Sequence, residues 1–193
     1  IKSAYLSEMF PKEGEKYPKM RFEGFTEQWE EKKLNEISNY HTSSVSSKDV
    51  KEIGKYKLYD ANELIGYISN ERLNQKYITI IKDGSGVGRV RLLEKDSYFI
   101  GTMGAISALE MTNIYYLYAY LEKFNFTDYI IGATIPHVYY SDYGNSVDYH
   151  PGLKEQKKIG SFFKKLDDQI ELEEEKLAKL EKVKEAYLDD LFV

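Results

Sequence analysis

The sequence predicts an α+β protein in which a strand-dominated, mixed globular domain is followed by one long C-terminal helix of the coiled-coil type. Two patterns support this prediction. Apolar residues recur in alternating steps of four and three near the C-terminus, and short runs of β-branched and aromatic residues alternate with turn residues before it. The chain of 193 residues is also long enough for one domain with a core and an appended helix.

The long helix is predicted within residues 151–193, which contain no glycine or proline after Pro151 and Gly152 except Gly160. Proline suits the start of a helix, where the backbone N–H has no helical partner. A helix from Lys154 to Phe192 would measure about 58 Å, so we expect a second helix, from the same chain or a partner, to cover its apolar stripe. Polar residues, Glu173 and Lys184, occupy two slots of the stripe. The apolar slots hold Ile159, Phe163, Leu166, Ile170, Leu177, Leu180, Tyr187 and Leu191.

The two ends of the chain resemble each other. Residues 1–10 and 183–192 share Lys, Ala, Tyr, Leu and Phe in the same register. Such a repeat suggests that the chain is one period of a longer tandem protein, with residues 1–17 forming the end of a preceding helix and a linker. Chance similarity between two amphipathic helix ends is the alternative.

The globular domain is predicted over residues 18–150. We expect strands at 56–59, 77–81, 89–93, 97–100 and 105–111, with a further strand at 134–140 interrupted by a proline. Helical spacing and aromatic residues predict a helix at 114–124, and the Ser-rich segment 41–48 is predicted as a loop.

Composition excludes several classes of protein. No apolar run approaches the length of a transmembrane helix, and the first residues lack a signal-peptide layout, so we expect a soluble cytoplasmic protein. The absence of cysteine excludes disulfides, thiolate zinc sites and cysteine catalysis. The three histidines, His41, His137 and His150, lie far apart without an acidic cluster, so we expect no metal site.

The glycine run Gly84, Gly86 and Gly88 lacks the glycine spacing and the Gly-Lys-Ser/Thr of a P-loop. A predicted strand with Arg89 and Arg91 follows it, whereas a dinucleotide-binding loop leads into a helix. The run is either a tight loop that lets the backbone approach a phosphate or an ordinary hairpin turn. Without a nucleophile motif or a methyltransferase tetrapeptide, we expect no chemistry from this chain alone.

A basic stretch, residues 72–95, suggests contact with nucleic acid although the whole chain carries a net charge of −5. Local charge decides phosphate binding, and a polar, aromatic patch after Pro136 could hydrogen-bond base edges or form a packed domain edge. The candidate DNA-binding residues are Arg72, Lys76, Lys82, Ser85, Arg89, Arg91, His137, Tyr139 and Tyr140. The net charge and the 18 tyrosines favour the alternative of a coiled-coil adaptor whose globular head binds another protein.

Three segments resemble the specificity subunit of type I restriction-modification systems. They are residues 18–22 followed by Trp29, residues 132–137, and residues 153–159 leading into the long helix up to 192. The resemblance implies a target recognition domain joined to a conserved spacer helix that packs antiparallel with a second spacer. This chain has one such unit, so it resembles either the second half of a subunit or a half-size subunit that could self-associate through the spacer.

The resemblance also implies a function. A chain of this kind would be a non-catalytic DNA-recognition subunit that reads one half of a bipartite double-stranded target and docks a DNA methyltransferase (modification) subunit and a restriction subunit. S-adenosylmethionine, ATP and Mg would be bound by those partners, and no cofactor is expected on this chain.

Overall fold

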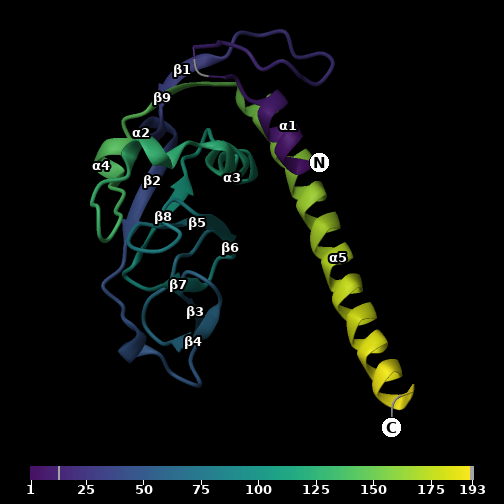
Figure 1. The fold of residues 1–193 in the computed structure, drawn as a ribbon. Helices are drawn as coiled ribbons and strands as arrows, with labels where there is room; N and C mark the ends of the chain where they lie inside the picture. Colours follow the sequence, from purple (N-terminus) through teal and green to yellow (C-terminus); the bar gives the residue numbers. More distant parts are fainter. Residues whose placement is uncertain (13, 192–193) are drawn as a thin grey trace.

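One helix, α5 (Leu153–Leu191), runs along one side of the molecule in the computed structural model, which describes residues 1–12 and 14–191. Of residues 189–191 only the backbone is described. The first turns of α5 lie against the rest of the chain, which we call the head, and its far part extends away from the head (Figure 1). The predicted fold class, an α+β head with a long C-terminal helix, is confirmed.

Two sheets form the body of the head. The larger sheet is antiparallel in the order β2-β8-β5-β6, and its central strand β5 is buried along its whole length, as its β-branched residues predict. The smaller sheet has the order β4-β3-β7, with β3 and β7 parallel. The larger sheet contains β2 (Ser38–Thr42), β5 (Tyr77–Ile81), β6 (Val90–Leu93) and β8 (Met103–Ala108), and the smaller one β3 (Tyr56–Tyr59), β4 (Leu64–Ile68) and β7 (Ser97–Phe99).

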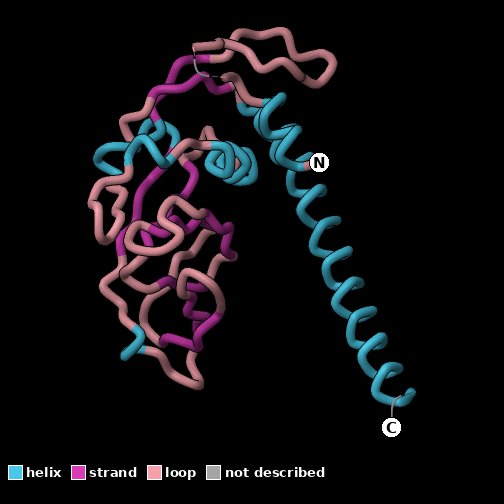
Figure 2. The backbone as a smooth tube through the Cα atoms, in the orientation of Figure 1, coloured by secondary structure: helices cyan, strands magenta, loops and turns pink. Residues whose placement is uncertain are grey.

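Within the head, a two-stranded ribbon leads from the two sheets to the start of α5. Strand β1 (Glu30–Lys33) pairs antiparallel with β9 (Val147–His150), and β9 leads directly into α5. Beyond this ribbon, residues 10–12 and 14–29, between α1 and β1, form no helix or strand and are drawn as loop (Figure 2). The short helices α2 (Leu34–Ile37) and α4 (Tyr140–Tyr143) and the 3-10 turns Ser47–Asp49 and Phe126–Tyr129 complete the head.

The main core lies around α3 (Ile114–Lys123), which packs between the larger sheet and the start of α5. Five of its ten residues are buried, as expected for an apolar helix face. Helix α1 (Lys2–Met9) lies beside the first part of α5 and runs in the opposite direction (Figure 1). Met9 and Phe10 enter the same core cluster as Ile159 and Phe163 of α5.

Two sequence predictions need correction, and three strands were missed. Residues 134–140 form no strand, because the chain turns there and α4 begins at Tyr140. The predicted loop 41–48 begins inside β2, and strands β1, β4 and β9 were not predicted.

No helix in the part of the chain that the structure describes is long and apolar enough to span a membrane.

Candidate nucleic-acid interface

The glycine loop between β5 and β6 is a tight turn closed by its own backbone. Gly84, Gly86 and Gly88 have φ angles of +83°, +80° and +86°, and a Cβ on Gly88 would lie 2.7 Å from Cβ of Phe126. The amide of Gly84 donates to the carbonyl of Pro136 (2.9 Å), and the amides of residues 87–89 donate to carbonyls at or next to the loop. Most backbone amides of this loop already donate hydrogen bonds to carbonyls of the protein. The hairpin-turn interpretation is therefore favoured over a loop whose amides bind a phosphate.

Residues 131–137 fold back beside this turn. Ile131 and His137 exchange two backbone hydrogen bonds (2.9 and 2.8 Å), and Nδ1 of His137 lies 2.7 Å from Oδ1 of Asp83. The amide of Val138 donates to the carbonyl of Lys82 (3.0 Å). We call the loops 60–63, 82–88 and 131–139 the loop edge. The structure brings four of the predicted contact residues together there: Lys82, Ser85, His137 and Tyr139.

Arg89 and Arg91 connect the 60–63 loop to the rest of the loop edge. Nη2 of Arg89 donates to the carbonyl of Ala61 (2.6 Å) and to Oδ1 of Asn62 (2.7 Å). Nη1 of Arg91 donates to the carbonyl of Asn62 (3.1 Å), and its guanidinium lies 5.0 Å from the ring centre of Tyr59. Both arginines therefore position the loop between β3 and β4.

Arg72 and Lys76 lie away from the loop edge. Lys76 precedes β5 and Lys82 follows it, so the whole strand separates the two lysines. Lys76 forms an ion pair with Glu94, and Arg72 forms one with Asp96. The stretch 72–95 is therefore divided between two places and does not form one basic face.

Tyr140 packs against the head. Its ring stacks on Tyr40 with centroids 4.5 Å apart and planes 5° apart, and its hydroxyl lies 3.1 Å from Oγ of Ser38. Burial raises the pKa of Tyr140. The packed-edge interpretation therefore applies to Tyr140, whereas the neighbouring Tyr139 is 49% exposed and remains a candidate contact.

The first part of the α5 stripe is covered by the same chain. Ile159 and Phe163 are 2% and 1% exposed, and Leu166 is partly buried against the same core cluster. In this structure α1 and α3 of the same chain cover Ile159 and Phe163, so the surface of the stripe that is open to another helix begins beyond them. Their predicted role in an interface between two spacer helices stays a prediction.

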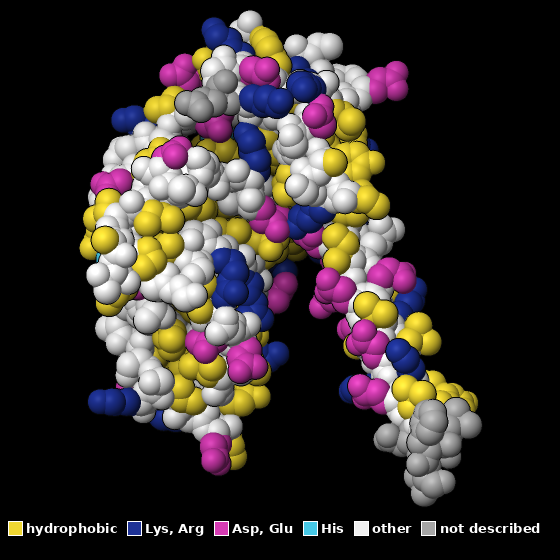
Figure 3. Space-filling view, in the orientation of Figure 1, with side chains coloured by type: hydrophobic (Ala, Val, Ile, Leu, Met, Phe, Trp, Pro, Cys, Tyr) yellow, Lys and Arg dark blue, Asp and Glu magenta, His cyan; other side chains and the backbone are white. Residues whose placement is uncertain are grey.

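The far part of the stripe has no cover among the described residues. Ile170, Leu177, Leu180 and Tyr187 are 38%, 57%, 65% and 66% exposed, and hydrophobic side chains are visible along this part of α5 (Figure 3). The side chain of Leu191 lies outside the described residues. An exposed apolar stripe on an isolated helix indicates a site for another helix.

The joint between the head and α5 contains a buried ion pair. Nε and Nη2 of Arg21 donate to the two carboxylate oxygens of Glu155 (2.9 and 2.7 Å), and Nε1 of Trp29 donates to Oε2 (3.1 Å). Glu155 is 4% exposed. The hydrogen-bonded carboxylate raises the pKa of Arg21, so the guanidinium stays charged.

The next residue continues the joint on the side of α3. Oε1 of Gln156 accepts a hydrogen bond from the amide of Asn113 (2.9 Å), and its Nε2 donates to the carbonyl of Pro151 (2.9 Å). A Cβ on Gly160 would lie 2.4 Å from Oδ1 of Asn113 and 2.7 Å from the amide nitrogen of Tyr116. Only glycine lets α5 approach α3 this closely.

His150, the last residue of β9, also contributes to the joint. Its Nδ1 lies 2.8 Å from the hydroxyl of Tyr116, and its ring meets Tyr120 edge to face at 4.9 Å. Burial lowers the pKa of His150 to about 3, so the ring is neutral at physiological pH. Among the described residues no group of three or more His, Cys, Asp or Glu could hold a metal ion.

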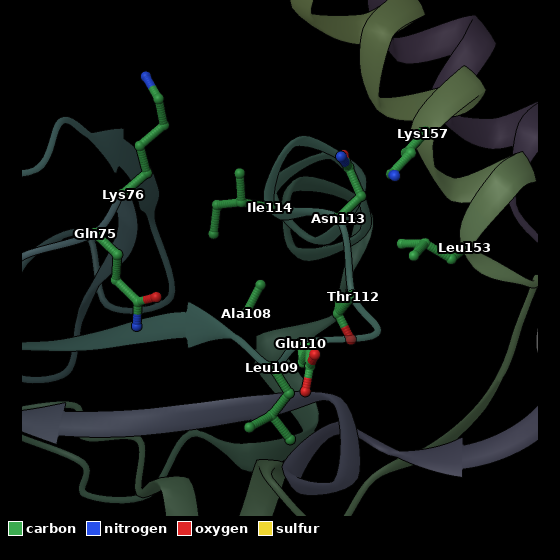
Figure 4. Close-up of a pocket in the computed structure, with 10 residues that line it drawn as sticks. All are labelled: Gln75, Lys76, Ala108, Leu109, Glu110, Thr112, Asn113, Ile114, Leu153 and Lys157. Atoms are coloured by element: carbon green, nitrogen blue, oxygen red, sulfur yellow. The ribbon is translucent and has the colours of Figure 1, made fainter.

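A cavity of about 430 Å³ lies next to this joint (Figure 4). Its walls come from the head and from the start of α5, so its shape depends on how the joint is held. The lining residues are Gln75, Lys76, Ala108, Leu109, Glu110, Thr112, Asn113, Ile114, Leu153 and Lys157.

Comparison with known protein families identifies the family of this chain. The sequence model of the type I restriction modification DNA specificity domain matches residues 26–182, which include most of the head and most of α5. The chain belongs to this family.

Solved structures share the fold of this specificity domain. The S subunit of the type I restriction-modification system from M. genitalium is 17% identical with a TM-score of 0.60, over 74% of this chain and 40% of that one. The HsdS subunit from Thermoanaerobacter tengcongensis is 16% identical with a TM-score of 0.62, over 89% and 43%. A chain from a study of complex assembly and conformational transition of the type I R-M system is 18% identical with a TM-score of 0.70, over 97% and 50%.

The specificity domain thus spans half or less of the length of each of these chains. Comparison with curated proteins gives no match.

Two of the three segments that carried the resemblance meet in the specificity domain at the joint. Residues 18–22 and Trp29 provide one side of the ion pair, and residues 153–159 provide the other. The sequence analysis assigned no role to Glu155 or Gln156. A signal was present, because they precede the apolar Ile159 by four and three positions and so share its face of the helix.

Proposed function

We propose that this chain is the sequence-specific DNA-recognition module of a type I restriction-modification complex and reads one half of a bipartite duplex target. The loop edge is the observation that carries the proposal. Three loops from separate parts of the sequence are fixed to one another by hydrogen bonds, and they present polar and aromatic side chains on a rigid head. Residues 18–150 are the recognition domain in this proposal, and residues 151–193 are the spacer.

Each side chain on the loop edge has a role suited to its chemistry. Lys82 contacts a phosphate, while the hydroxyls of Ser85 and Tyr139 bond base edges in a groove. His137, held by Asp83, orients the loop that carries Tyr139. Arg89 and Arg91 act through the 60–63 loop and also add positive charge at its base.

The chemistry on DNA belongs to partner subunits in this proposal. The chain itself does no catalysis, the modification subunit supplies S-adenosylmethionine, and the restriction subunit supplies ATP and Mg. The apolar surface of α5 is wide enough for more than one contact, because Leu172 and Val183 lie on the face next to the stripe and are each 51% exposed. One spacer helix would cover the stripe, and the modification subunit would cover this second face.

Pairing with a second spacer would set the distance between two recognition heads. The joint fixes the direction in which α5 leaves the head through the contacts of Glu155 and Gln156. Two heads on an antiparallel pair of spacers are then separated by a set length, so the spacing between half-sites is a geometric consequence.

Equilibrium binding of the complex with its modification subunit to duplex DNA tests the proposal. Lys82→Ala should weaken binding and reduce the slope of log affinity against log salt by about one. Lys95→Ala is the matched control, because Lys95 is exposed and lies outside the loop edge. An unchanged salt slope in Lys82→Ala, or equal affinity for a target duplex and a scrambled duplex, would contradict it.

A protein-binding head is the second candidate, and one observation favours it. Ile131 and Ile135 on the loop edge are 51% and 56% exposed, and exposed apolar side chains are common in protein interfaces. This candidate predicts that Ile135→Asp abolishes binding of a protein to the head, while DNA has no effect on the complex.

A further inference from the structure

A closely packed pair of tyrosine rings lies next to the loop edge. The ring centres of Tyr40 and Tyr140 are 4.5 Å apart, with planes 5° apart, and Tyr143 meets Tyr140 edge to face at 5.3 Å. Tyr143 is 1% exposed. Tyr140 follows directly after Tyr139, the 49% exposed side chain that the proposed function uses as a base contact. The packed rings therefore hold the chain at the position next to that contact.

Tyr40 reaches this position across the larger sheet. It lies on β2 opposite Ile106 of β8, and Gly104 is two positions away on β8, which makes it a diagonal neighbour of Tyr40. A Cβ on Gly104 would lie 2.1 Å from the hydroxyl oxygen of Tyr40 and 2.5 Å from its Cζ. The ring thus lies over the backbone of Gly104, and a larger residue there would displace it.

The ring of Tyr40 also lies near the 82–88 loop. It extends toward the start of β8, where the amide of Lys82 donates to the carbonyl of Thr102 (3.2 Å). Burial and, to a smaller extent, the negative charge of Asp83 raise the pKa of Tyr40. Tyr40 is therefore placed between one loop of the loop edge and the residue that follows Tyr139.

Hydrogen bonds fix the same segment on its other contacts. The hydroxyl of Tyr140 lies 3.1 Å from Oγ of Ser38 and donates to the carbonyl of Ser38 (3.3 Å). The carbonyl of Tyr139 accepts from the amides of Asp142 and Tyr143 (3.0 and 3.2 Å), so its backbone is fixed at the start of α4. A side chain reads a base edge only if its direction is set by the packing of its neighbours.

We propose that Tyr40 is a positioning residue for DNA reading, which fixes Tyr140 by stacking and thereby sets the direction of the Tyr139 side chain. Tyr40 acts through Tyr139 and does not itself contact a base. The proposal rests on the DNA-recognition function proposed above. It extends the residues that determine sequence preference to a strand of the larger sheet, outside the loop edge.

The discrimination ratio of the complex with its modification subunit tests the proposal. It is the Kd for a scrambled duplex divided by the Kd for a duplex that the parent complex selects from a random pool. Tyr40→Leu should lower the ratio by about tenfold. Its Kd for the scrambled duplex and its salt slope should not change, which shows that the head remains folded. Tyr40→Phe keeps the ring and should retain the ratio that Tyr40→Leu loses.

Tyr149→Leu is the matched control. Tyr149 is a partly buried tyrosine packed against the same main core, but it lies on β9, away from the loop edge. Its replacement removes an aromatic ring from the head and should leave the discrimination ratio unchanged. An equal fall of the ratio in Tyr149→Leu and Tyr40→Leu would overturn the proposal, because any loss of packing in the head would then have the same effect.

Gly104→Ala moves the same ring without changing either tyrosine. The added Cβ displaces the Tyr40 ring, so the discrimination ratio should fall. In a Tyr40→Leu background, Gly104→Ala should have no further effect, because leucine lacks the ring atoms that the Cβ would meet. An unchanged ratio in Gly104→Ala, or the same effect in both backgrounds, would overturn the proposal.

A second pair of variants separates positioning from direct contact with DNA. In a Tyr139→Ala background, Tyr40→Leu should cause no further loss of the discrimination ratio, because the side chain that it positions is absent. Losses that multiply, or an unchanged ratio in Tyr40→Leu alone, would overturn the proposal. A ratio of one for the parent complex would contradict the DNA-recognition function and this proposal with it, so the two failures are distinguishable.

Discussion

Arg21 and Glu155 lie 134 positions apart in the sequence and form an ion pair with two hydrogen bonds at the joint between the head and α5. The pair is buried, with side chains 16% and 4% exposed. Together with Trp29 it connects the segment before β1 to the first turn of α5. The direction of α5 therefore depends on contacts at its first turn.

Breaking this ion pair should destabilise the fold strongly. Arg21→Ala leaves the buried carboxylate of Glu155 without its charged partner, and we expect a loss of about 3–5 kcal/mol in the free energy of unfolding. Urea denaturation followed by circular dichroism measures this change. Lys19→Ala is the control, because Lys19 is exposed and its 3.8 Å contact with Glu8 should contribute little. A loss below about 1 kcal/mol for Arg21→Ala would contradict the role of the pair.

Gly160→Ala tests the close approach of α5 to α3. The added Cβ meets the start of α3, so we expect a loss of about 1–3 kcal/mol although alanine favours helices. Ser161→Ala, at the exposed neighbouring position, should change stability by no more than about 0.5 kcal/mol. Equal stability of Gly160→Ala and the parent chain would contradict this prediction, because α5 could then move away from α3 without a loss in the free energy of unfolding.

His150 predicts a pH dependence of stability. Its pKa is about 3 in the folded chain against an ordinary 6.5, so the unfolded chain binds more protons between these values. Its contribution to stability is complete above pH 6.5 and decreases by up to about 1.4 kcal/mol per pH unit as pH falls toward 3.

The comparison with His150→Asn isolates this contribution. Burial raises the pKa of Glu122 and Asp148, and their effect has the opposite sign at low pH. The difference in unfolding free energy between the two chains should therefore shrink as pH falls from 6.5. A difference that stays constant would contradict a buried neutral imidazole.

Two leucines of the stripe should behave differently on replacement by glutamate. Leu180 is 65% exposed, so Leu180→Glu should leave the stability of the monomer within about 0.5 kcal/mol and prevent spacer pairing. Leu166 packs against the core cluster, so Leu166→Glu should destabilise the monomer itself by about 1–3 kcal/mol. Thermal melts and light scattering at several concentrations separate the two effects, and equal melts for both variants would contradict the division of the stripe.

The spacing of apolar residues predicted the elements that form by burying their own side chains. The 3.5-residue stripe gave α5, and the β-branched run 77–81 gave the buried β5. Strand β1 is Glu-Glu-Lys-Lys and carries no such pattern. It is a strand because its backbone pairs with β9, a contact between residues more than a hundred positions apart that local sequence does not reveal.

The candidate nucleic-acid interface was predicted only in part, because local sequence does not reveal which distant residues meet in the fold. Sequence proximity placed Arg72 and Lys76 with Lys82, whereas β5 separates them in space. His137 and Lys82 were named for different reasons and lie together because Val138 pairs with Lys82. The stripe was predicted as one surface, but no local pattern shows that α1 and α3 cover its first part.

Selection from a pool of random duplexes by the complex with its modification subunit tests the central claim most directly. The account predicts enrichment of a bipartite motif with a fixed gap, and loss of sequence preference in one half or both when Ser85 and Tyr139 are replaced by alanine. Recovery of duplexes without any shared motif, under conditions in which the complex binds DNA, would contradict it.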